Sequence, residues 1–169
     1  MSSMRRLARP HARGALLLPV FVFLAVFPAR LTPQEDAVKI EAAAEPRRLM
    51  RGEEGKIRLR LQVPKGTYLS VSSFLIEFTP LEDVVLPKTF FTVSDLGLEV
   101  LEESGVSYLN IASPIEIPFT VSPDARRGSH ILRGRVKYIA RSIAGGWCLK
   151  STAKFSVSLS TSPAVKDVP

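Results

Sequence analysis

Side chains that bind metals or attack substrates are scarce in this sequence. Its 169 residues include one cysteine, Cys148, and two histidines, of which only His130 lies beyond the first 29 residues. A structural zinc site of cysteine and histidine ligands needs four such residues, and a disulfide within the chain needs two thiols. We therefore expect no metal site and no internal disulfide, and we expect His130 at the solvent-exposed start of a strand.

Phosphate-binding loops, helices and convergent acids are missing as well. No glycine-rich loop precedes a helix, and only residues 41–50 could form a helical turn, which Pro46 would limit. The acidic residues form neighbouring pairs: Glu53-Glu54, Glu82-Asp83 and Glu102-Glu103. Catalytic carboxylates must converge across a cleft, whereas these neighbours point apart and are predicted to be solvated loop charges. The sequence thus predicts no cofactor and no self-sufficient enzyme.

The net charge of +7 is concentrated at the N-terminus. Residues 1–29 contain four arginines and no acid; without them the 23 Lys and Arg become 19 against 16 Asp and Glu, a net charge of +3. The remaining charges alternate in sign and cluster only in pairs such as Arg47-Arg48. Because no basic stripe is interleaved with aromatic residues, we expect no nucleic-acid partner.

Residues 1–29 have the order of parts of an export signal. A basic segment, 5–13, precedes an apolar run over 15–27, which Pro28-Ala29 ends. The run is shorter than the roughly 20 residues that span a bilayer as a helix, and Phe27 is bulky for a cleavage site. We expect either a signal peptide or an uncleaved N-terminal anchor, the one contact with a membrane, followed by a linker at 30–37. The protein is therefore predicted to be periplasmic or secreted.

Beyond the linker, apolar residues recur with a period of two. Residues 57–63, 115–121 and 155–159 alternate cleanly, as strands do because successive side chains point to opposite faces. Further strand candidates are 38–40, 74–78, 108–111 and 131–139, separated by proline and glycine turns.

This pattern predicts an all-β fold, an immunoglobulin-like antiparallel sandwich of two sheets over 38–160. Leu59 and Phe119 should lie in its core, and Pro118 should mark an edge strand or a bulge. The tail, 161–169, is polar and is predicted to be disordered.

One segment, residues 138–149, combines a strand end, a Gly145-Gly146 turn and a Trp147-Cys148 pair. It predicts a hairpin that carries a thiol near its tip. Strand alternation places Trp147 and Cys148 on opposite faces, but it leaves two registers open. In one, the thiol is buried as an inert packing group; in the other, it is accessible.

The same segment resembles the end of the N-terminal domain of DsbD, the bacterial thiol:disulfide interchange protein. Tyr138, Gly145, Trp147, Cys148 and the strand at 155–159 follow the order of that family. Residues 63–69 and Leu86-Pro87 are similar to two of its earlier turns. The resemblance implies a periplasmic immunoglobulin-like sandwich whose last hairpin carries a redox pair of cysteines.

The chain departs from that family where its chemistry occurs. The place of the first redox cysteine falls on Arg141 or Ser142, and Lys150-Ser151 replaces the prolines that follow the second. A disulfide relay needs a second thiol to resolve the mixed disulfide.

We therefore expect a module that binds a protein partner, such as a thioredoxin-like or envelope protein, without redox turnover of its own. The alternative is a relay in which Cys148 forms mixed disulfides with a partner and Arg141 favours the thiolate.

Overall fold

The computed structural model describes residues 38–103 and 105–162. These residues are mainly strands, with one short helix, α1 (Val93–Leu96), and a 3₁₀ turn at Val71–Ser73. The strands are β1 (Lys39–Glu45), β2 (Arg48–Met50), β3 (Glu54–Gln62), β4 (Thr67–Leu69), β5 (Leu75–Phe78), β6 (Val84–Val85), β7 (Phe90–Thr92), β8 (Val100–Glu103), β9 (Val106–Leu109), β10 (Ile115–Val121), β11 (Gly128–Ser142) and β12 (Trp147–Ser162). The predicted all-β fold is confirmed.

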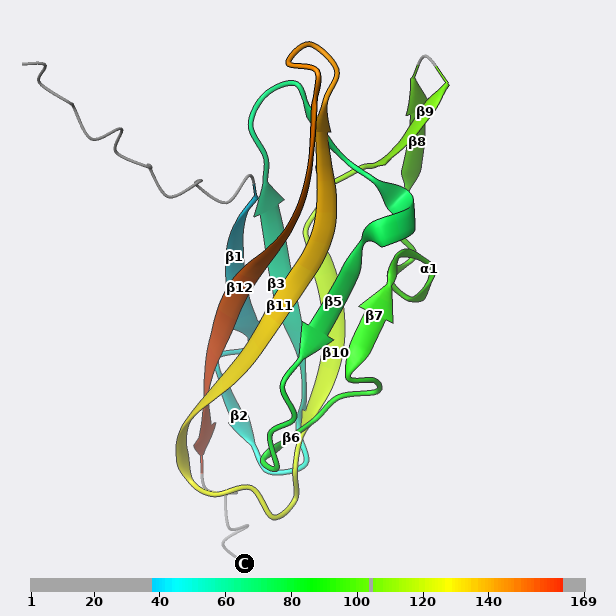
Figure 1. Cartoon of the computed structure of the whole chain (residues 1–169). Helices are drawn as coiled ribbons and strands as arrows, with labels where there is room; N and C mark the ends of the chain where they lie inside the picture. Colours follow the sequence, from blue (N-terminus) through cyan, green and yellow to red (C-terminus); the bar gives the residue numbers. More distant parts are fainter. Residues whose placement is uncertain (1–37, 104, 163–169) are drawn as a thin grey trace, which may run out of the picture. The chain divides into compact units, whose positions relative to one another are not determined.

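The strands form two main sheets that pack face to face (Figure 1). A four-stranded sheet has the order β1-β3-β10-β6, and a six-stranded sheet has the order β2-β12-β11-β5-β7, with β4 also paired to β11. Strands β8 and β9 form a separate hairpin. All pairings are antiparallel except that of β2 with β12, which is parallel. The fold is an immunoglobulin-like sandwich, as the period-two pattern predicted.

The core lies between the two sheets because alternate side chains of each strand point inward. Along β3 the burial alternates residue by residue, and Leu59 is fully buried. Phe119 of β10 is 2% exposed. Both predicted core positions are confirmed.

A glycine opposite a phenylalanine recurs in both sheets. Gly55 pairs with Phe119 in one sheet, and Gly134 pairs with Phe155 in the other. A Cβ at Gly55 would lie 2.7 Å from the Phe119 ring, and one at Gly134 would lie closer still to the Phe155 ring. The rings therefore occupy the space that a side chain at either glycine would need, an arrangement known to help fix strand register.

Some expectations for the chain's ends and turns need correction. No helical turn forms at 41–50; these residues make up β1 and β2, with Ala44 and Leu49 turned into the core. Strand β12 continues to Ser162, two residues into the expected tail. The signal or anchor at 1–29, the linker at 30–37 and residues 163–169 lie outside the described residues.

Pro118 lies in β10 opposite Lys56. On its other side β10 pairs with β6 only at Thr120 and Val121. The strand therefore has an open edge at the proline among the described residues, which agrees with the expected edge position because proline cannot donate to a neighbouring strand. No described helix is long and apolar enough to cross a membrane.

Candidate functional site

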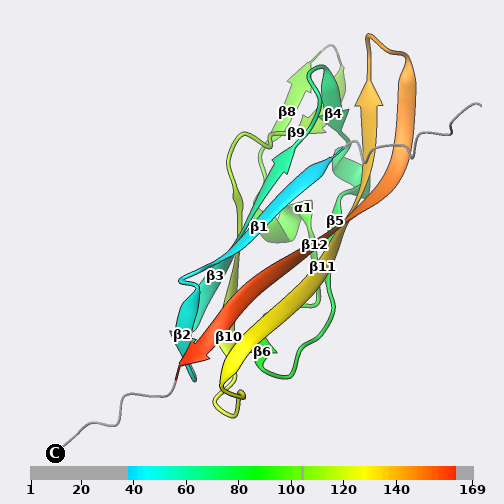
Figure 2. The same ribbon diagram turned by 90° about the vertical axis from the view of Figure 1, so that its left-hand side faces the viewer.

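The hairpin of β11 and β12 is the longest element of the sandwich. Its strands have 15 and 16 residues and stay in register from Gly128 opposite Thr161 to Ser142 opposite Trp147. Inward side chains are buried along most of β11, but no residue from 141 to 150 is. The tip therefore extends past the core, at the same end as β4 and the β8–β9 hairpin (Figures 1 and 2).

Two large apolar side chains are exposed at this tip. Ile143 is 61% exposed, and Trp147, the one tryptophan of the chain, is 39% exposed. The turn is tight because the backbone N–H of Gly145 donates to the Ser142 hydroxyl at 3.1 Å and Gly146 has a φ of 64°. A Cβ at Gly145 would lie 2.8 Å from the Trp147 ring. The glycine thus lets the indole lie against the turn.

Cys148 is exposed, and the pairing of β12 with β11 places it on the outer side of the hairpin, so the thiol is accessible. It lies directly opposite Arg141, and Arg141 lies opposite Tyr68 of β4. Residues that face each other across paired strands share one side of the sheet. Cys148, Arg141 and Tyr68 therefore form a row on the outer side, while Ser142 and Trp147 lie on the other side of the hairpin.

Tyr138 does not belong to this group. Its side chain is 1% exposed and points into the core, opposite Ser151. Its hydroxyl has no hydrogen-bond partner among the described residues. The structure thus brings Arg141, Ser142, Trp147 and Cys148 together at the tip and places Tyr138 in the packing beneath it.

Tyr68 of this row also contacts a second tyrosine, Tyr108, which its sequence position does not predict. The rings of Tyr68 and Tyr108 meet edge to face, with centroids 4.8 Å apart. Burial and the nearby Glu103 carboxylate raise the pKa of Tyr108, whose hydroxyl donates to Glu103 at 3.4 Å. A depression of about 310 Å³ adjoins the pair and is lined mainly by apolar side chains, including Val63, Leu101 and Ile111. Forty residues separate the two tyrosines, so no local pattern connects them.

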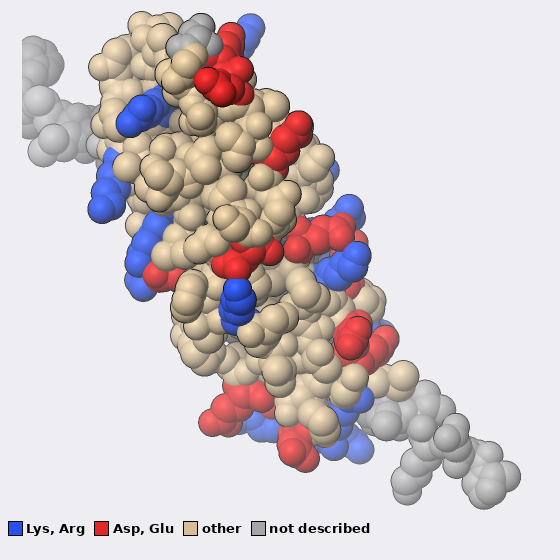
Figure 3. Space-filling model, turned by 90° about the vertical axis from the view of Figure 1, so that its right-hand side faces the viewer, with Lys and Arg blue, Asp and Glu red and all other residues tan. Residues whose placement is uncertain are grey.

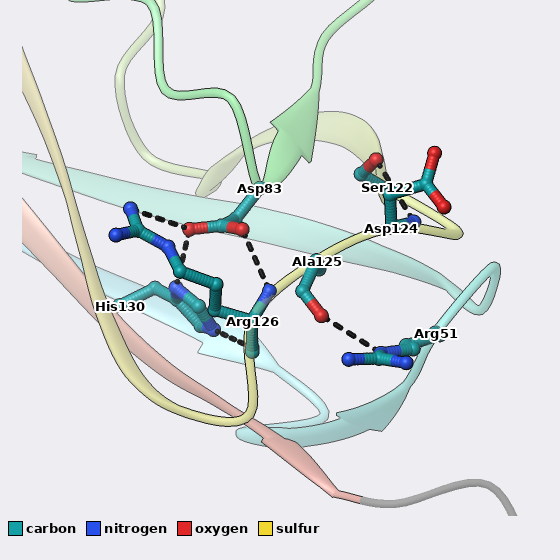
Figure 4. A network of polar contacts seen from close by, with 7 residues as sticks. All are labelled: Arg51, Asp83, Ser122, Asp124, Ala125, Arg126 and His130. Atoms are coloured by element: carbon teal, nitrogen blue, oxygen red, sulfur yellow. Dashed lines mark hydrogen bonds and ion pairs between the residues drawn. The ribbon is translucent and has the colours of Figure 1, made fainter.

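A second polar cluster lies near β6 and the start of β11 (Figure 4). His130 is 7% exposed; its Nε2 lies 2.9 Å from the Arg126 carbonyl, and its Nδ1 lies 3.2 Å from the Asp83 carboxylate. Asp83, 5% exposed, also accepts the backbone N–H of Arg126 at 2.8 Å. The predictions of a solvent-exposed His130 and a solvated Asp83 are therefore wrong, since inward-facing position 130 is covered by the loop at 122–127.

This cluster holds a loop rather than a reactive group. Arg51 Nε donates to the Ala125 carbonyl at 2.7 Å, from the other side of the same loop (Figure 4). Neither contact of His130 is with a serine or cysteine side chain, so the arrangement lacks a nucleophile. Within the described ranges, no three His, Cys, Asp or Glu side chains are grouped closely enough to hold a metal ion.

The cluster predicts a pH-dependent stability. The backbone N–H of Arg126, with the nearby His130 ring and Arg126 guanidinium, holds the pKa of Asp83 below its ordinary value. The ionised Asp83 carboxylate then contributes its full stabilisation of the fold at pH values above the ordinary aspartate pKa of about 3.9. This contribution is lost as the pH falls through the lower pKa that Asp83 has in the folded state. We expect Asp83→Asn to lower the melting temperature at pH 7 by about 5 °C or more.

The difference in melting temperature between Asp83→Asn and the wild type should shrink as the pH is lowered below about 4. Thermal melts of both proteins between pH 3 and 7 measure this difference. Asp124→Asn, an exposed carboxylate in the same loop, is the matched control and should melt like the wild type. Equal melting temperatures of the two variants at pH 7 would show that the cluster does not stabilise the fold.

The comparisons with known proteins assign no family to this chain. No family model matches the sequence, and no curated protein matches it. Similar solved structures include PapD-like domain 7 of human CEP192, with 16% identity over 92% of this chain and 99% of that one and a TM-score of 0.35. A type I cohesin of ScaB from Pseudobacteroides cellulosolvens has 11% identity over 77% and 96%, with a TM-score of 0.38.

A putative membrane-anchored protein from Corynebacterium diphtheriae has 12% identity over 80% of this chain and 38% of that one, with a TM-score of 0.42. Similarity at this level does not indicate what the chain binds.

Proposed function

We propose that this chain is an exported binding module that contacts a protein partner through the tip of the β11–β12 hairpin. The observation that carries the proposal is the exposure of Ile143 and Trp147 on a tight turn beyond the core. Tryptophan is enriched among the residues that contribute most to protein interfaces, because its large rigid side chain buries much apolar area at a small entropic cost. A partner that covered both side chains would remove this apolar surface from water.

The composition of the site supports binding rather than catalysis. The tip offers an indole, an aliphatic side chain, a thiol and a guanidinium, and the nearby tyrosines add an aromatic wall. Among the described residues, no pair of acidic and basic side chains contacts the Cys148 thiol. A rigid sandwich that presents such side chains on a turn can recognise a partner without reacting with it.

A thiol relay is the second candidate, favoured by the exposed Cys148 opposite Arg141 and by the resemblance of this hairpin to that of the DsbD N-terminal domain. Attack on a partner's disulfide, which forms a mixed disulfide with one partner cysteine and releases the other as a thiolate, is possible for a single accessible thiol. Multiple turnovers are not, because the chain holds no second thiol to resolve the intermediate. The partner would have to supply the resolving cysteine.

A pull-down from the periplasmic fraction separates the two candidates. Immobilised wild-type protein should retain a partner equally with and without reductant, and so should Cys148→Ser. The double variant Ile143→Ser, Trp147→Ala should lose most of that partner, whereas Val85→Ser, which changes an apolar side chain 54% exposed on β6, should keep it.

The opposite pattern would replace the proposal. Retention that disappears with reductant and in Cys148→Ser would make the thiol relay the function. Equal retention by the tip variant and the Val85 variant would place the binding surface away from the tip.

A further inference from the structure

The outer face of the six-stranded sheet carries charges of nearly one sign. Its strands contain seven Lys and Arg and a single carboxylate, Glu77 of β5; the cations are Arg48, Arg133, Arg135, Lys137, Arg141, Lys150 and Lys154. Those on β11 and β12 alternate with inward-facing residues and so all point outward. The register then places Arg135 opposite Lys154. We call the outer side of β11 and β12, from residue 131 to 141 and from 148 to 158, the basic face.

The other sheet shows that this imbalance is not a general property of the sandwich. Strands β1, β3 and β10 contain equal numbers of cations and acids: Lys39, Lys56, Arg58 and Arg60 against Glu41, Glu45, Glu54 and Glu116. Several of these are paired, with Lys56 2.9 Å from Glu116 and Arg58 3.0 Å from Glu45. The side that bears β7 and α1 also shows both signs interspersed (Figure 3).

Glu77 neutralises only part of the basic face. It forms ion pairs with Arg135 and Lys137. The hydrogen bond from Lys137 and, to a smaller extent, the one from Arg135 lower the pKa of Glu77. Arg133, Lys150 and Lys154 form no ion pair within the described part of the chain. Cations that lie close together on one face without enough carboxylates to pair with repel one another. Docking of an anionic partner there reduces this repulsion and is therefore favourable.

The centre of the basic face is hollowed. A depression of about 350 Å³ is lined by Arg133, Arg135 and Lys154, with Glu77 and the backbone of Gly134. Phe78 and Phe155 also line it, and Ile131, 54% exposed, lies two residues from Arg133 on the same side of β11. Cations around a depression with apolar neighbours suit a carboxylate-bearing side chain that arrives on a folded or extended polypeptide.

We infer that the basic face is the docking surface for an acidic segment of a protein partner. The inference rests on the proposed function, because the face continues into the tip: Arg141 belongs to it and lies opposite Cys148. A partner that covers Ile143 and Trp147 and also reaches the outer side of the hairpin would place its acidic residues along β11 and β12.

Two other polyanions fit the geometry less well. Membrane-surface elements carry their cations on one face and a broad apolar face on the other, whereas here the side of β11 and β12 opposite the cations is buried in the core of the sandwich. Proteins that bind single-stranded nucleic acids place aromatic rings among the cations for base stacking. Here the outer aromatic residues, Tyr68 and Phe90, lie on β4 and β7, and none lies between the cations of β11 and β12.

Binding to a labelled oligoglutamate peptide of about 20 residues tests the inference. The full chain should bind it with an affinity that falls as salt rises, because salt screens exposed charges. The variant Arg133→Glu, Lys150→Glu, Lys154→Glu should bind at least about tenfold more weakly. The variant Lys39→Glu, Arg60→Glu, Arg127→Glu changes the net charge equally at exposed positions elsewhere and should stay within about threefold of the wild type.

A map of amide chemical shifts on the wild-type protein provides a test that no variant can spoil by misfolding. Addition of the peptide should shift residues of β11 and β12 around 133–137 and 150–156. Shifts confined to the other sheet, equal binding by both charge variants, or no binding at all would overturn the inference. Tighter binding to vesicles with anionic lipid or to duplex DNA than to the peptide would also overturn it and assign the face to that polyanion.

The tip variant Ile143→Ser, Trp147→Ala shows which of the two proposals fails if only one of them is wrong. It retains every cation of the basic face and should bind the peptide like the wild type. If the tip proves irrelevant to the natural partner, the peptide result still stands. If the peptide does not bind, the pull-down at the tip is unaffected.

Discussion

Phe119→Ala should lower the free energy of unfolding by about 3–5 kcal/mol. Phe119 is 2% exposed between the sheets, and its ring covers the space beside Gly55 on the neighbouring strand. Truncation would leave a cavity that Gly55, which has no side chain, cannot fill. The loss therefore includes both the transfer free energy of the ring and the cost of the cavity.

Phe90→Ala is the matched control for this measurement. The same side chain is removed, but Phe90 is 55% exposed on β7, so the change should stay within about 0.5 kcal/mol. Urea denaturation of both variants gives the two values. A loss at Phe119 no larger than that at Phe90 would contradict the arrangement of the core.

Export should be an all-or-none property of the first 40 residues. Fused to a reporter that is active only outside the cytoplasm, they should deliver full activity, because a basic segment followed by an apolar run is the pattern that export machinery accepts. Leu17→Arg with Phe23→Arg places two charges in the apolar run and should abolish the activity.

Thr32→Arg with Gln34→Arg adds the same two charges in the linker and should leave export intact. Reporter activity that is confined to the cytoplasm for the unaltered segment would remove the basis for a periplasmic or secreted protein. Equal loss in both double variants would show that added charge, rather than the apolar run, decides the outcome.

The fold could be predicted because its signal is local. Alternation along 57–63 and 115–121 reflects a single physical fact, the opposite orientation of neighbouring side chains in a strand. It identified Leu59 and Phe119 as core residues without any knowledge of their partners. The same reasoning failed at 41–50, where a run of alanines fits a helix as well as a strand, and packing against β3 decided for the strand.

The polar contacts could not be predicted because they join distant segments. Asp83 is 43 residues from Arg126, whose backbone N–H it accepts, and nothing near either residue indicates the other. The basic face could not be predicted from the sequence for the same reason. Its cations are separated by inward-facing residues on β11 and lie on two strands, and only the register brings them together.

The candidate site was predicted in part. The glycine turn correctly indicated a hairpin with Trp147 and Cys148 at its tip, since glycine permits the positive φ of Gly146. Which of the two side chains would be exposed depended on where the core ends, and the structure shows the tip beyond it, with both exposed. Tyr138 was grouped with them by proximity in sequence, although its position on β11 turns it inward.

Site-specific photocrosslinking in cells tests the central claim most directly. A benzophenone amino acid at position 143, on the hairpin tip, should yield a discrete adduct with one protein. The same amino acid at position 85, which is also apolar and more than half exposed but lies on β6, should not. The adduct should persist in Cys148→Ser and withstand reductant. Adducts of equal yield from both positions, or none from position 143, would contradict a binding site at the tip of β11 and β12.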